Sequence, residues 1–507
     1  MFSSPLLALY FLPLLFFLLC FFRLFSNTSK KNYPPSPPKL PILGNLHQIG
    51  PYPHRSLRTL AQKYGPLMLL HYGNVPVLIV SSAISAREIM KTHDLSFSSR
   101  PKPSIATRLL YDSKDVAFSP YGDYWRHVRS ICVLHLLSNK RVQSFHEVRE
   151  EETALMVDKI RSCSRSSLIL VNMTDMFTTL TNNIVCRVAL GRKYDGEGEG
   201  KRVSELLAEL LELLGISDLR DYIPWLSWIN KITGLDAKVD RVAKGMDEFL
   251  EGLVDERMNR YKREKDGSGN HGSEETQDFV DILLEIQREN AAGCSPVHRD
   301  TIKAVIMDML GGGTDTTTTS LVWTLTELLR HPRVMKKLQN EVREIAKGKP
   351  NVNEDDLEKM HYLKAVVKEA LRIRAPVPLL IARESIQDVR VMGYDIAAGT
   401  QVQINAWAIA RDPSTWENPE EFRPERFLNN SMDLKGQDFE FIPFGAGRRG
   451  CPGILFAINV YELALAKVVQ CFDLSLPSGG DLDMTENPGL VIHKRMPLMV
   501  VASPFSF

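Results

Sequence analysis

The chain has 507 residues, a net charge of +1 at pH 7 and a hydrophobic content of 44%. This length allows one large core or several ordinary domains, and the balanced charge argues against a nucleic-acid-binding or disordered protein. The seven cysteines lie far apart without paired spacing, which argues against a disulfide framework or zinc site and favours a reducing compartment.

The N-terminal 22 residues carry no charged side chain, and residues 5–22 are almost entirely Leu, Phe, Ala and Tyr. A helix of this stretch, rising about 1.5 Å per residue, nearly spans a hydrocarbon core of about 30 Å. A cleaved signal peptide fits less well, because no basic segment precedes the run and no A-x-A-like site follows it. By the positive-inside rule, Arg23 and the lysines after it predict that the globular part of the chain lies in the cytosol. We therefore expect a transmembrane anchor at residues 1–23.

A basic and proline-rich hinge is expected next, at residues 24–44, where the sequence PPSPPKLP is stiff and extended. It suits a spacer between membrane and globular body, and an ordinary linker is the alternative. The globular domain should then occupy residues 45–507. Its first elements are two short strands, 67–72 and 75–82, joined through Gly73 and Asn74 as a hairpin.

Helical spacing of apolar residues dominates from Asp123 to about Arg260, with an amphipathic pattern at 204–214. The polar stretch 262–277 predicts an exposed loop between helices, not a domain boundary. Strands in the remainder are few and short, and no internal repeat is present. The expected fold class is therefore mainly α with small β-sheets.

Residues 301–330 predict one long helix with an unfavourable middle. Three consecutive glycines, 311–313, precede a threonine-rich run, and each interior glycine costs roughly 1 kcal/mol relative to alanine. Tertiary packing must therefore hold this helix, and the weak middle predicts a local kink or widened groove. Two helices separated by a glycine loop are the alternative. The apolar period resumes in phase at Leu321, which favours a single helix.

The strongest chemical signal is the run PFGAGRRGCPG at residues 443–453. A thiolate is a strong electron-donating ligand, and the glycines let the backbone approach a flat, bulky partner. A free cysteine in a tight turn is the alternative. The arginine two positions before Cys451 and the phenylalanine seven positions before it disfavour that alternative, because several residue types coincide at fixed spacing.

Residues 443–453 resemble the haem-binding loop of cytochrome P450 enzymes, F-x-x-G-x-R-x-C-x-G, at every specified position. Residues 312–317 resemble the family's helix motif [AG]-G-x-[DE]-T-[TS], and residues 125–129 resemble its W-R-x-x-R helix. The motifs run in family order along essentially the whole chain. The hinge and the sequence NLHQ at 45–48 are similar to plant microsomal members of the 71 clan, family 71. The resemblance implies the cytochrome P450 fold behind an N-terminal transmembrane helix.

The resemblance also implies a cofactor and the residues around it. The cofactor is haem b (iron protoporphyrin IX), with Cys451 as the metal ligand. Thr316 and Asp315 are the implied catalytic residues, which deliver protons in a dry pocket. The implied haem contacts are Trp125, Arg129, Arg383, Phe444, Arg449 and Gly453.

A structural triad is implied as well. Glu369 and Arg372 lie at i and i+3 on one helix face, and Arg426 belongs to a P-E-R-F segment. In the family such residues form a buried cluster that supports the haem loop. Ala375 and Ala382 stand where the family usually has proline, which weakens the assignment of Arg383 slightly.

The substrate pocket is implied only in outline, and its apolar character favours a lipophilic ligand. The pocket residues carried over are Val116, Gly312, Ala375, Val377, Leu379 and Leu490. The resemblance implies an NADPH- and O2-dependent monooxygenase of a small lipophilic plant metabolite, such as a terpenoid, coumarin, phenolic or alkaloid. The expected reactions are hydroxylation, epoxidation or oxidative ring closure.

Two other functions stay open at this point. One is a haem-thiolate dehydratase or isomerase that acts on an oxime or peroxide, which the intact Asp315-Thr316 pair disfavours. The other is a haem-binding sensor or carrier without turnover.

The expected partners are NADPH-cytochrome P450 reductase, cytochrome b5 as an optional second donor, and membrane lipid, without nucleic acid. Arg126, Lys140 and Arg448 are candidates for a basic docking face, with plain solvated charge as the alternative. The expected location is the endoplasmic reticulum membrane, single-pass, with the catalytic domain in the cytosol.

Overall fold

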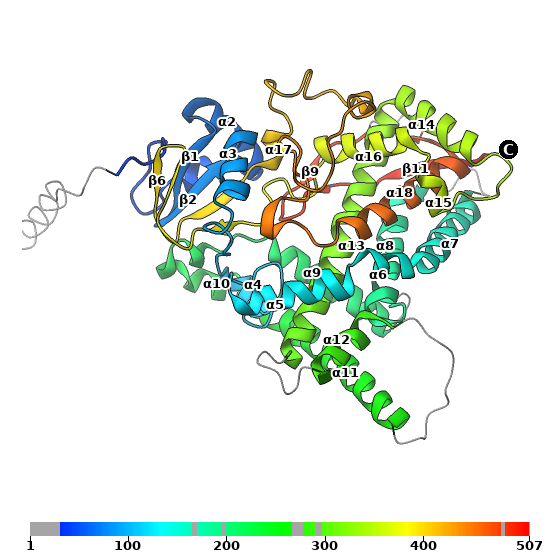
Figure 1. The fold of residues 1–507 in the computed structure, drawn as a ribbon, viewed down its shortest axis with the longest axis horizontal. Helices are drawn as coiled ribbons and strands as arrows, with labels where there is room; N and C mark the ends of the chain where they lie inside the picture. The colour runs from blue at the N-terminus through cyan, green and yellow to red at the C-terminus, as the bar shows by residue number, and fades with distance from the viewer. Residues whose placement is uncertain are drawn as a thin grey trace, which may run out of the picture.

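The structure is a computed structural model that describes residues 31–164, 170–194, 198–265, 277–289, 297–477 and 482–505. The expected anchor at 1–23, the start of the hinge and most of the polar stretch 262–277 lie outside the described residues. Figure 1 shows a small strand-rich part at one side, which includes β1, β2 and β6, and a larger helical part crossed by α13.

Helices make up most of the described chain, as the sequence predicts. The helices of more than eight residues are α2 (Pro53–Tyr64), α5 (Asp123–Ile131), α7 (His146–Ser164), α8 (Met173–Leu190), α9 (Glu199–Leu214), α11 (Leu235–Lys265), α12 (Phe279–Glu289), α13 (Arg299–Arg330), α14 (Pro332–Ile345), α16 (His361–Ile373) and α18 (Ile454–Cys471). The short ones are α3 (Ala83–Arg87), α4 (Ser104–Leu109), α6 (Asn139–Ser144), α10 (Trp228–Ile232), α15 (Glu354–Leu357) and α17 (Ala406–Ile409). Single turns are η1 (Leu46–Gln48), η2 (Glu88–Thr92), η3 (Cys132–Leu136), η4 (Leu219–Asp221), η5 (Pro224–Leu226), η6 (Pro424–Phe427) and η7 (Gly447–Arg449).

The strands form four small sheets. The largest has the order β1 (Leu67–Tyr72), β2 (Val75–Val80), β7 (Gln401–Ile404), β4 (Arg383–Glu384). The others join β3 (Val171–Asn172), β11 (Met499–Pro504) and β8 (Phe472–Ser475); β5 (Val389–Val391) and β6 (Tyr394–Ile396); and β9 (Glu486–Asn487) and β10 (His493–Lys494). The predicted hairpin is confirmed, because β1 and β2 pair antiparallel with Tyr72 opposite Val75.

The proline-rich hinge packs onto this sheet where it is described. The N–H of Leu69 donates to the carbonyl of Pro35 at 2.9 Å, and Pro34 and Pro37 are buried. A bridge between Gly44 and Tyr72 extends the contact along β1. Residues 34–44 are therefore part of the globular body rather than a free spacer.

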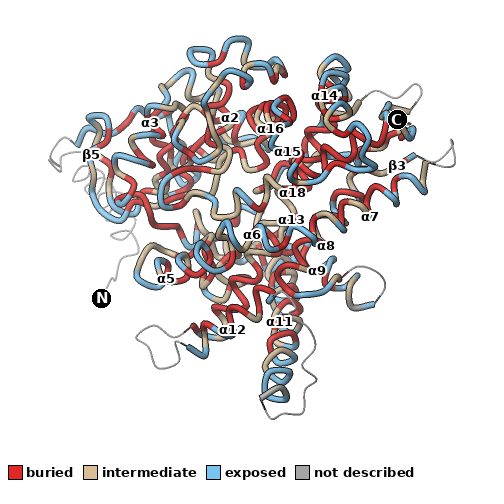
Figure 2. Tube along the Cα trace, turned by 45° about the vertical axis from the view of Figure 1, so that its right-hand side comes forward, coloured by how far each residue is buried: buried red, intermediate tan, exposed pale blue. Residues whose placement is uncertain are grey.

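The long central helix is one continuous element, so the alternative of two helices is wrong. Helix α13 has 32 residues, and its packing against α8 includes a hydrogen bond between the hydroxyls of Thr318 and Thr181 at 2.6 Å. Thr324 and Thr326 donate to carbonyls one turn earlier, which satisfies their hydroxyls inside the core. Figure 2 shows buried residues concentrated along α13, α8 and α18. Tertiary contacts thus support a helix that its own propensity disfavours.

Helix α18 is also long and apolar enough to cross a membrane, but 67% of it is buried inside the protein. Its buried side chains belong to the main apolar core together with α7, α8 and α13. Burial of this kind is typical of a core helix.

Candidate active site

Cys451 lies at the end of a tight loop that leads into α18. Gly447 has a φ of 66°, and a Cβ at this position would lie 2.4 Å from the carbonyl oxygen of Met90. Only glycine meets both conditions without strain. The backbone N–H of Cys451 donates to the carbonyl of Phe444 at 2.9 Å and closes the loop. The glycines predicted to shape this loop therefore hold the cysteine in one defined position.

The Cys451 side chain has a large accessible area, although protein atoms surround it. The accessible area and the surrounding protein atoms are compatible if the sulfur faces a space inside the protein. Burial raises the pKa of the Cys451 thiol, whereas the N–H of Gly453 and the charge of Arg129 act in the opposite direction. The start of α18 adds positive potential near the sulfur. These groups favour an anionic sulfur once a metal replaces its proton.

Helix α13 presents an open face at its middle. Gly312 is exposed in the centre of a core helix, and a Cβ there would meet nothing within 4 Å. Thr316 lies one turn later on the same face, and its hydroxyl donates to the carbonyl of Gly312 at 2.8 Å. The neighbouring Gly313 is different, because its Cβ would lie 3.0 Å from Val185 of α8. Gly312 alone provides space, and Gly313 permits close packing of two helices.

A short segment connects this helix face to the cysteine loop. The N–H of Val116 donates to Asp308 of α13 at 2.6 Å. The carbonyl of the same residue accepts from Arg449 and from the indole N–H of Trp125, at 3.3 and 3.0 Å. Val116 therefore places the two predicted halves of the site against each other. Asp308 was not predicted, because nothing local distinguishes it from a surface carboxylate.

Asp315 forms an ion pair that the sequence did not predict. Its Oδ1 lies 2.7 Å from Nε2 of His493 on β10, while its Oδ2 is buried and has no hydrogen-bond partner in the described structure. Burial alone would lower the pKa of His493, but the hydrogen bond and charge of Asp315 outweigh it and raise that pKa. The two residues are far apart in the sequence, so only the fold brings them together.

Four arginines gather beside the cysteine loop. Arg449 donates to the carbonyls of Ser98 and Ser119, both at 2.6 Å, and lies over the Trp125 ring. Burial and the nearby charges of Arg383 and Arg129 lower the pKa of Arg449 to about 9. The members of this arginine cluster are Arg100, Arg129, Arg383 and Arg449.

Only part of this charge is compensated within the protein. Arg383 pairs with Asp94 at 3.1 Å, whereas Arg129 donates to the carbonyl of Gly450. Arg100 donates to the carbonyls of Ala117, Ile381 and Ala382. Burial and the other arginines lower the pKa of Arg100. A cluster whose members destabilise one another's charge is suited to a dianionic group. The sequence offered no local signal for Arg100.

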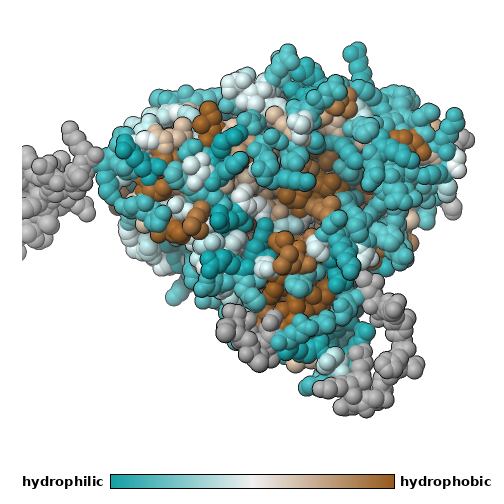
Figure 3. All heavy atoms as spheres, viewed as in Figure 1, coloured by the Kyte–Doolittle hydropathy of each residue, from teal (hydrophilic) through white to brown (hydrophobic). Residues whose placement is uncertain are grey.

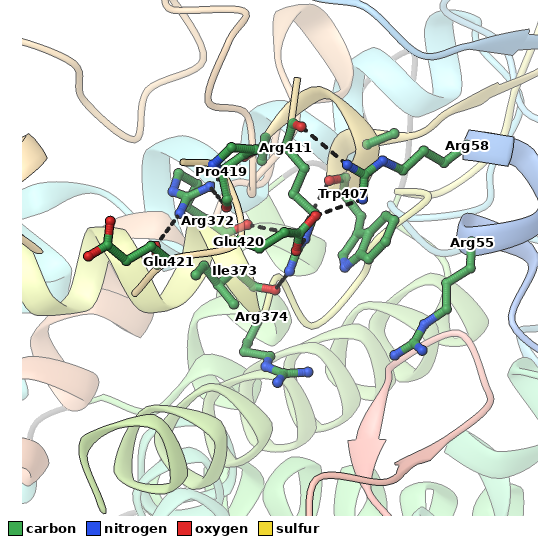
Figure 4. A network of polar contacts seen from close by, with 12 residues as sticks. Arg55, Arg58, Arg372, Ile373, Arg374, Trp407, Arg411, Pro419, Glu420 and Glu421 are labelled. Carbon is green, nitrogen blue, oxygen red and sulfur yellow. Dashed lines mark hydrogen bonds and ion pairs between the residues drawn. The ribbon is translucent and has the colours of Figure 1, made fainter. Parts of the chain in front are cut away.

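The predicted structural triad is assembled around Glu369. Arg372 makes a two-point contact with this carboxylate at 2.7 and 2.9 Å, and Arg426 contacts it at 3.0 Å. Both Glu369 and Arg372 are fully buried. Figure 4 shows how Arg372 and Arg411 point into the segment that carries Pro419, Glu420 and Glu421, and Arg411 donates to the carbonyl of Ile373.

The predicted pocket residues fall into different surroundings. Val116 lies against α13, as described above, and Leu490 lies against Gly215 just after α9. Ala375 lines a small cavity with His54, Trp323 and Glu486, and Leu379 packs against the apolar cluster of β1 and β2. Val377 is half-buried. The segment 375–379 therefore lies between Trp323 of α13 and the strand-rich part.

Comparison with known proteins decides the family. The sequence model of the cytochrome P450 family matches residues 34–501. The chain belongs to the cytochrome P450 family. It is 57% identical to cytochrome P450 736A117 of Prunus mume, over 99% of this chain and 97% of that protein. It is 52% identical to (+)-menthofuran synthase of Mentha piperita, over 94% of each chain.

A solved structure of a zebra fish cytochrome P450 with progesterone superposes on this chain with a TM-score of 0.75. The match has 26% identity and covers 89% of this chain and 99% of the other. The cytochrome P450 fold and the placement among plant members of the 71 clan, both expected from the sequence, are confirmed. As a cytochrome P450, this protein is a haem-thiolate monooxygenase that uses haem b, with electrons from NADPH through a reductase.

The residues present fit that cofactor. Haem carries two propionates, and the arginine cluster beside the cysteine loop has the charge to hold them. Cys451 is exposed, and a Cβ at Gly453 would lie 3.9 Å from its sulfur. Phe444 packs at the edge of the main core next to this loop. In this cytochrome P450 the sulfur of Cys451 would hold the haem iron and the nearby arginines would hold its propionates.

Proposed function

We propose that this cytochrome P450 oxidises a small lipophilic specialised metabolite of plants, such as a terpenoid, coumarin, phenolic or alkaloid. The reaction is a hydroxylation, an epoxidation or an oxidative ring closure. Plant relatives act on terpenoid and alkaloid metabolites, and menthofuran synthase is named for one such product. The apolar residues predicted around the open face of α13 support a lipophilic substrate.

The observation that carries the proposal is the exposed Cys451, whose loop contacts Arg129 directly and α13 through Val116. In this proposal Cys451 binds the iron, and Arg129, Arg383 and Arg449 hold the propionates, while the Trp125 ring supports Arg449. Bound haem supplies activation of O2 and transfer of one oxygen atom to the substrate.

The remaining residues of the proposed site deliver protons and leave room beside α13. Gly312 leaves room beside α13, while Thr316 and Asp315 hold protons and pass them toward that room. Thr316 now donates to the carbonyl of Gly312, so its hydroxyl must turn to serve another acceptor. The apolar walls exclude water, which makes a dedicated proton route necessary.

The ligand assignment is tested by replacing Cys451 with serine in the full chain expressed in microsomes. We expect loss of the red-shifted Soret band of the reduced carbon monoxide complex and loss of NADPH-dependent product. A variant that keeps both would overturn the assignment. The control is Cys163→Ser, which changes a half-buried cysteine on α7 outside the site and should keep both signals.

The substrate class is tested by titrating the purified enzyme with a panel of plant metabolites and recording spin-state shifts. Compounds that shift the spectrum are then incubated with NADPH and reductase. Products that contain one added oxygen atom support the proposal. An oxime or peroxide that is converted without NADPH would instead establish the dehydratase or isomerase function.

We also propose a membrane location, with the chain anchored at residues 1–23 and the catalytic domain in the cytosol. Exposed apolar residues support it on the side where the chain enters the body: Ile42, Trp225, Trp228 and Ile232 are 54–76% exposed. Two backbone hydrogen bonds place these segments together, because Gly73 donates to Leu43 and Asn74 donates to Tyr222. Protease protection of intact microsomes tests the topology, and a lumenal catalytic domain would overturn it.

Reductase docking is proposed on the face that carries the cysteine loop. Lys140 is exposed in α6, whereas Arg126 pairs with Asp123 and Arg448 pairs with Asp94. Figure 3 shows hydrophobic residues gathered at the middle of the viewed face and hydrophilic residues over most of the rest. Charge reversal at Lys140 should slow reduction by the reductase and make it less sensitive to salt. Unchanged reduction would remove this residue from the interface.

A further inference from the structure

His493 is the charged partner of a residue that the proposed function uses for proton delivery. Its Nε2 lies 2.7 Å from Oδ1 of Asp315, and the side chains are 40% and 16% exposed, respectively. Histidine is therefore the more exposed member of the pair and aspartate the more buried one. The second oxygen of Asp315 is buried and unpartnered in the described structure, so it is free to carry a proton.

The backbone of His493 is held in place from two sides. The indole N–H of Trp323 on α13 donates to the carbonyl of Ile492 at 2.9 Å, and the N–H of Ile492 donates to the carbonyl of Pro376 at 2.9 Å. His493 pairs with Asn487 across the β9–β10 hairpin. These contacts fix the backbone that carries the imidazole, so the ion pair with Asp315 does not depend on a mobile loop.

The charged groups around His493 have partners of their own. Lys494, next on β10, contacts Asp483 at 3.6 Å, and Glu486 on β9 contacts Arg374 at 3.2 Å. Asp315 is the carboxylate whose hydrogen bond and charge act on His493. An arginine or lysine in this place would keep its proton at neutral pH, whereas an imidazole can release one.

We propose that His493 is a positioning residue for proton delivery, which orients the Asp315 carboxylate and resupplies its proton from solvent. The proposal rests on the proposed role of Asp315. In the resupply step the Nε2–H bond of the imidazolium breaks as an O–H bond forms at Oδ1. The products are a neutral imidazole and a carboxylic acid, and a hydronium ion or buffer acid from solvent then reprotonates the imidazole, releasing water or the buffer base. Asp315 can deliver protons repeatedly only if another group replaces each proton that it gives up.

The experiment compares His493→Ala, Asp315→Asn and the double variant in the full-length holoenzyme with reductase. The readouts are the ratio of product to NADPH consumed, the peroxide released and the solvent deuterium isotope effect on turnover. We expect His493→Ala to lower the ratio about tenfold and to raise the isotope effect. In the Asp315→Asn background the same change should have no further effect, because the partner is already lost.

Lys494→Gln is the matched control, since it changes the next residue of β10 without touching Asp315. It should leave the ratio and isotope effect unchanged. A rescue variant, His493→Gln, restores an N–H donor without a titratable proton. It should recover the orientation of Asp315 but keep the raised isotope effect, which separates positioning from resupply.

A readout independent of turnover is the NMR titration of the His493 imidazole in the oxidised holoenzyme, with its signal identified by its absence from His493→Ala. We expect a midpoint above the ordinary value for histidine, which returns toward that value in Asp315→Asn. An unshifted midpoint, or equal effects of His493→Ala in both backgrounds, would overturn the proposal. If Asp315→Asn itself kept normal coupling, the proposed role of Asp315 would fail instead.

Discussion

The guanidinium carbon of Arg449 lies 3.9 Å from the centre of the Trp125 ring. This contact joins the cysteine loop to α5, and both residues also bond to the carbonyl of Val116. The stacking holds one member of the arginine cluster flat against an apolar wall while the cluster's shared charge lowers its pKa. The protein thus holds a cationic group in place among other arginines.

The first prediction concerns haem retention. Arg449→Gln should speed loss of haem about tenfold, because one charge-assisted contact to a propionate is removed. Transfer of haem to an excess of apomyoglobin measures this rate. The control is Arg126→Gln, since Arg126 is exposed on α5 and pairs with Asp123. Equal rates for the two variants would contradict the role of the cluster.

The second prediction separates neighbouring glycines of α13. Gly312→Ala should raise stability by up to about 1 kcal/mol and weaken the spin-state shift caused by bulky ligands, because its Cβ enters open space. Gly313→Ala should not raise stability, because its Cβ would lie 3.0 Å from Val185. It should also leave the spin-state shift caused by ligands unchanged. Thermal unfolding and ligand titration measure the two effects. Identical behaviour of both variants would refute the assignment of space to Gly312.

The third prediction is a pH dependence of stability from Asp308 and Asp115. Burial raises the pKa of both carboxyls, to about 6 for Asp115, and each opposes the charge of the other. Above about pH 4 these carboxyls have lost their protons in the unfolded chain, whereas the folded protein still keeps a proton on the pair. Stability from this pair is present at low pH and falls as pH rises through the folded pKa.

Asp308→Asn should flatten that slope between pH 5 and pH 8 and stabilise the protein at pH 8 by about 1 to 3 kcal/mol. The asparagine oxygen can still accept from the N–H of Val116, so the connection to α13 is kept. Denaturant unfolding at several pH values measures the slope. A variant with the wild-type slope would show that another group causes it.

The fourth prediction concerns the buried triad. Glu369→Gln should cost about 3 to 5 kcal/mol, because Arg372 would remain buried without its counter-charge. Asp158→Asn breaks the exposed pair with Arg161 and should cost no more than about 1 kcal/mol. Denaturant unfolding of the holoenzyme compares the two. Similar small losses would mean that the triad contributes little to stability.

The sequence alone was sufficient for the mainly helical class, the β1–β2 hairpin and the long helix at 301–330. These features depend on local patterns: alternation of apolar residues, a turn at Gly73, and a period that resumes at Leu321. The cysteine loop could be recognised because its glycines and arginine occupy consecutive positions. The constraint at Gly447 is local in part, since a left-handed φ is a property of that residue.

Only the tertiary structure decided which residues meet across long separations. Nothing near His493 predicts that it faces Asp315, and nothing near Arg100 predicts a buried cationic cluster. Gly312 and Gly313 are indistinguishable in the sequence, yet one faces open space and the other α8. The spacing of apolar and polar residues along a helix or strand determines on which face of that element each side chain lies. Charge pairing and open space depend on elements that arrive from elsewhere in the chain, so packing alone determines them.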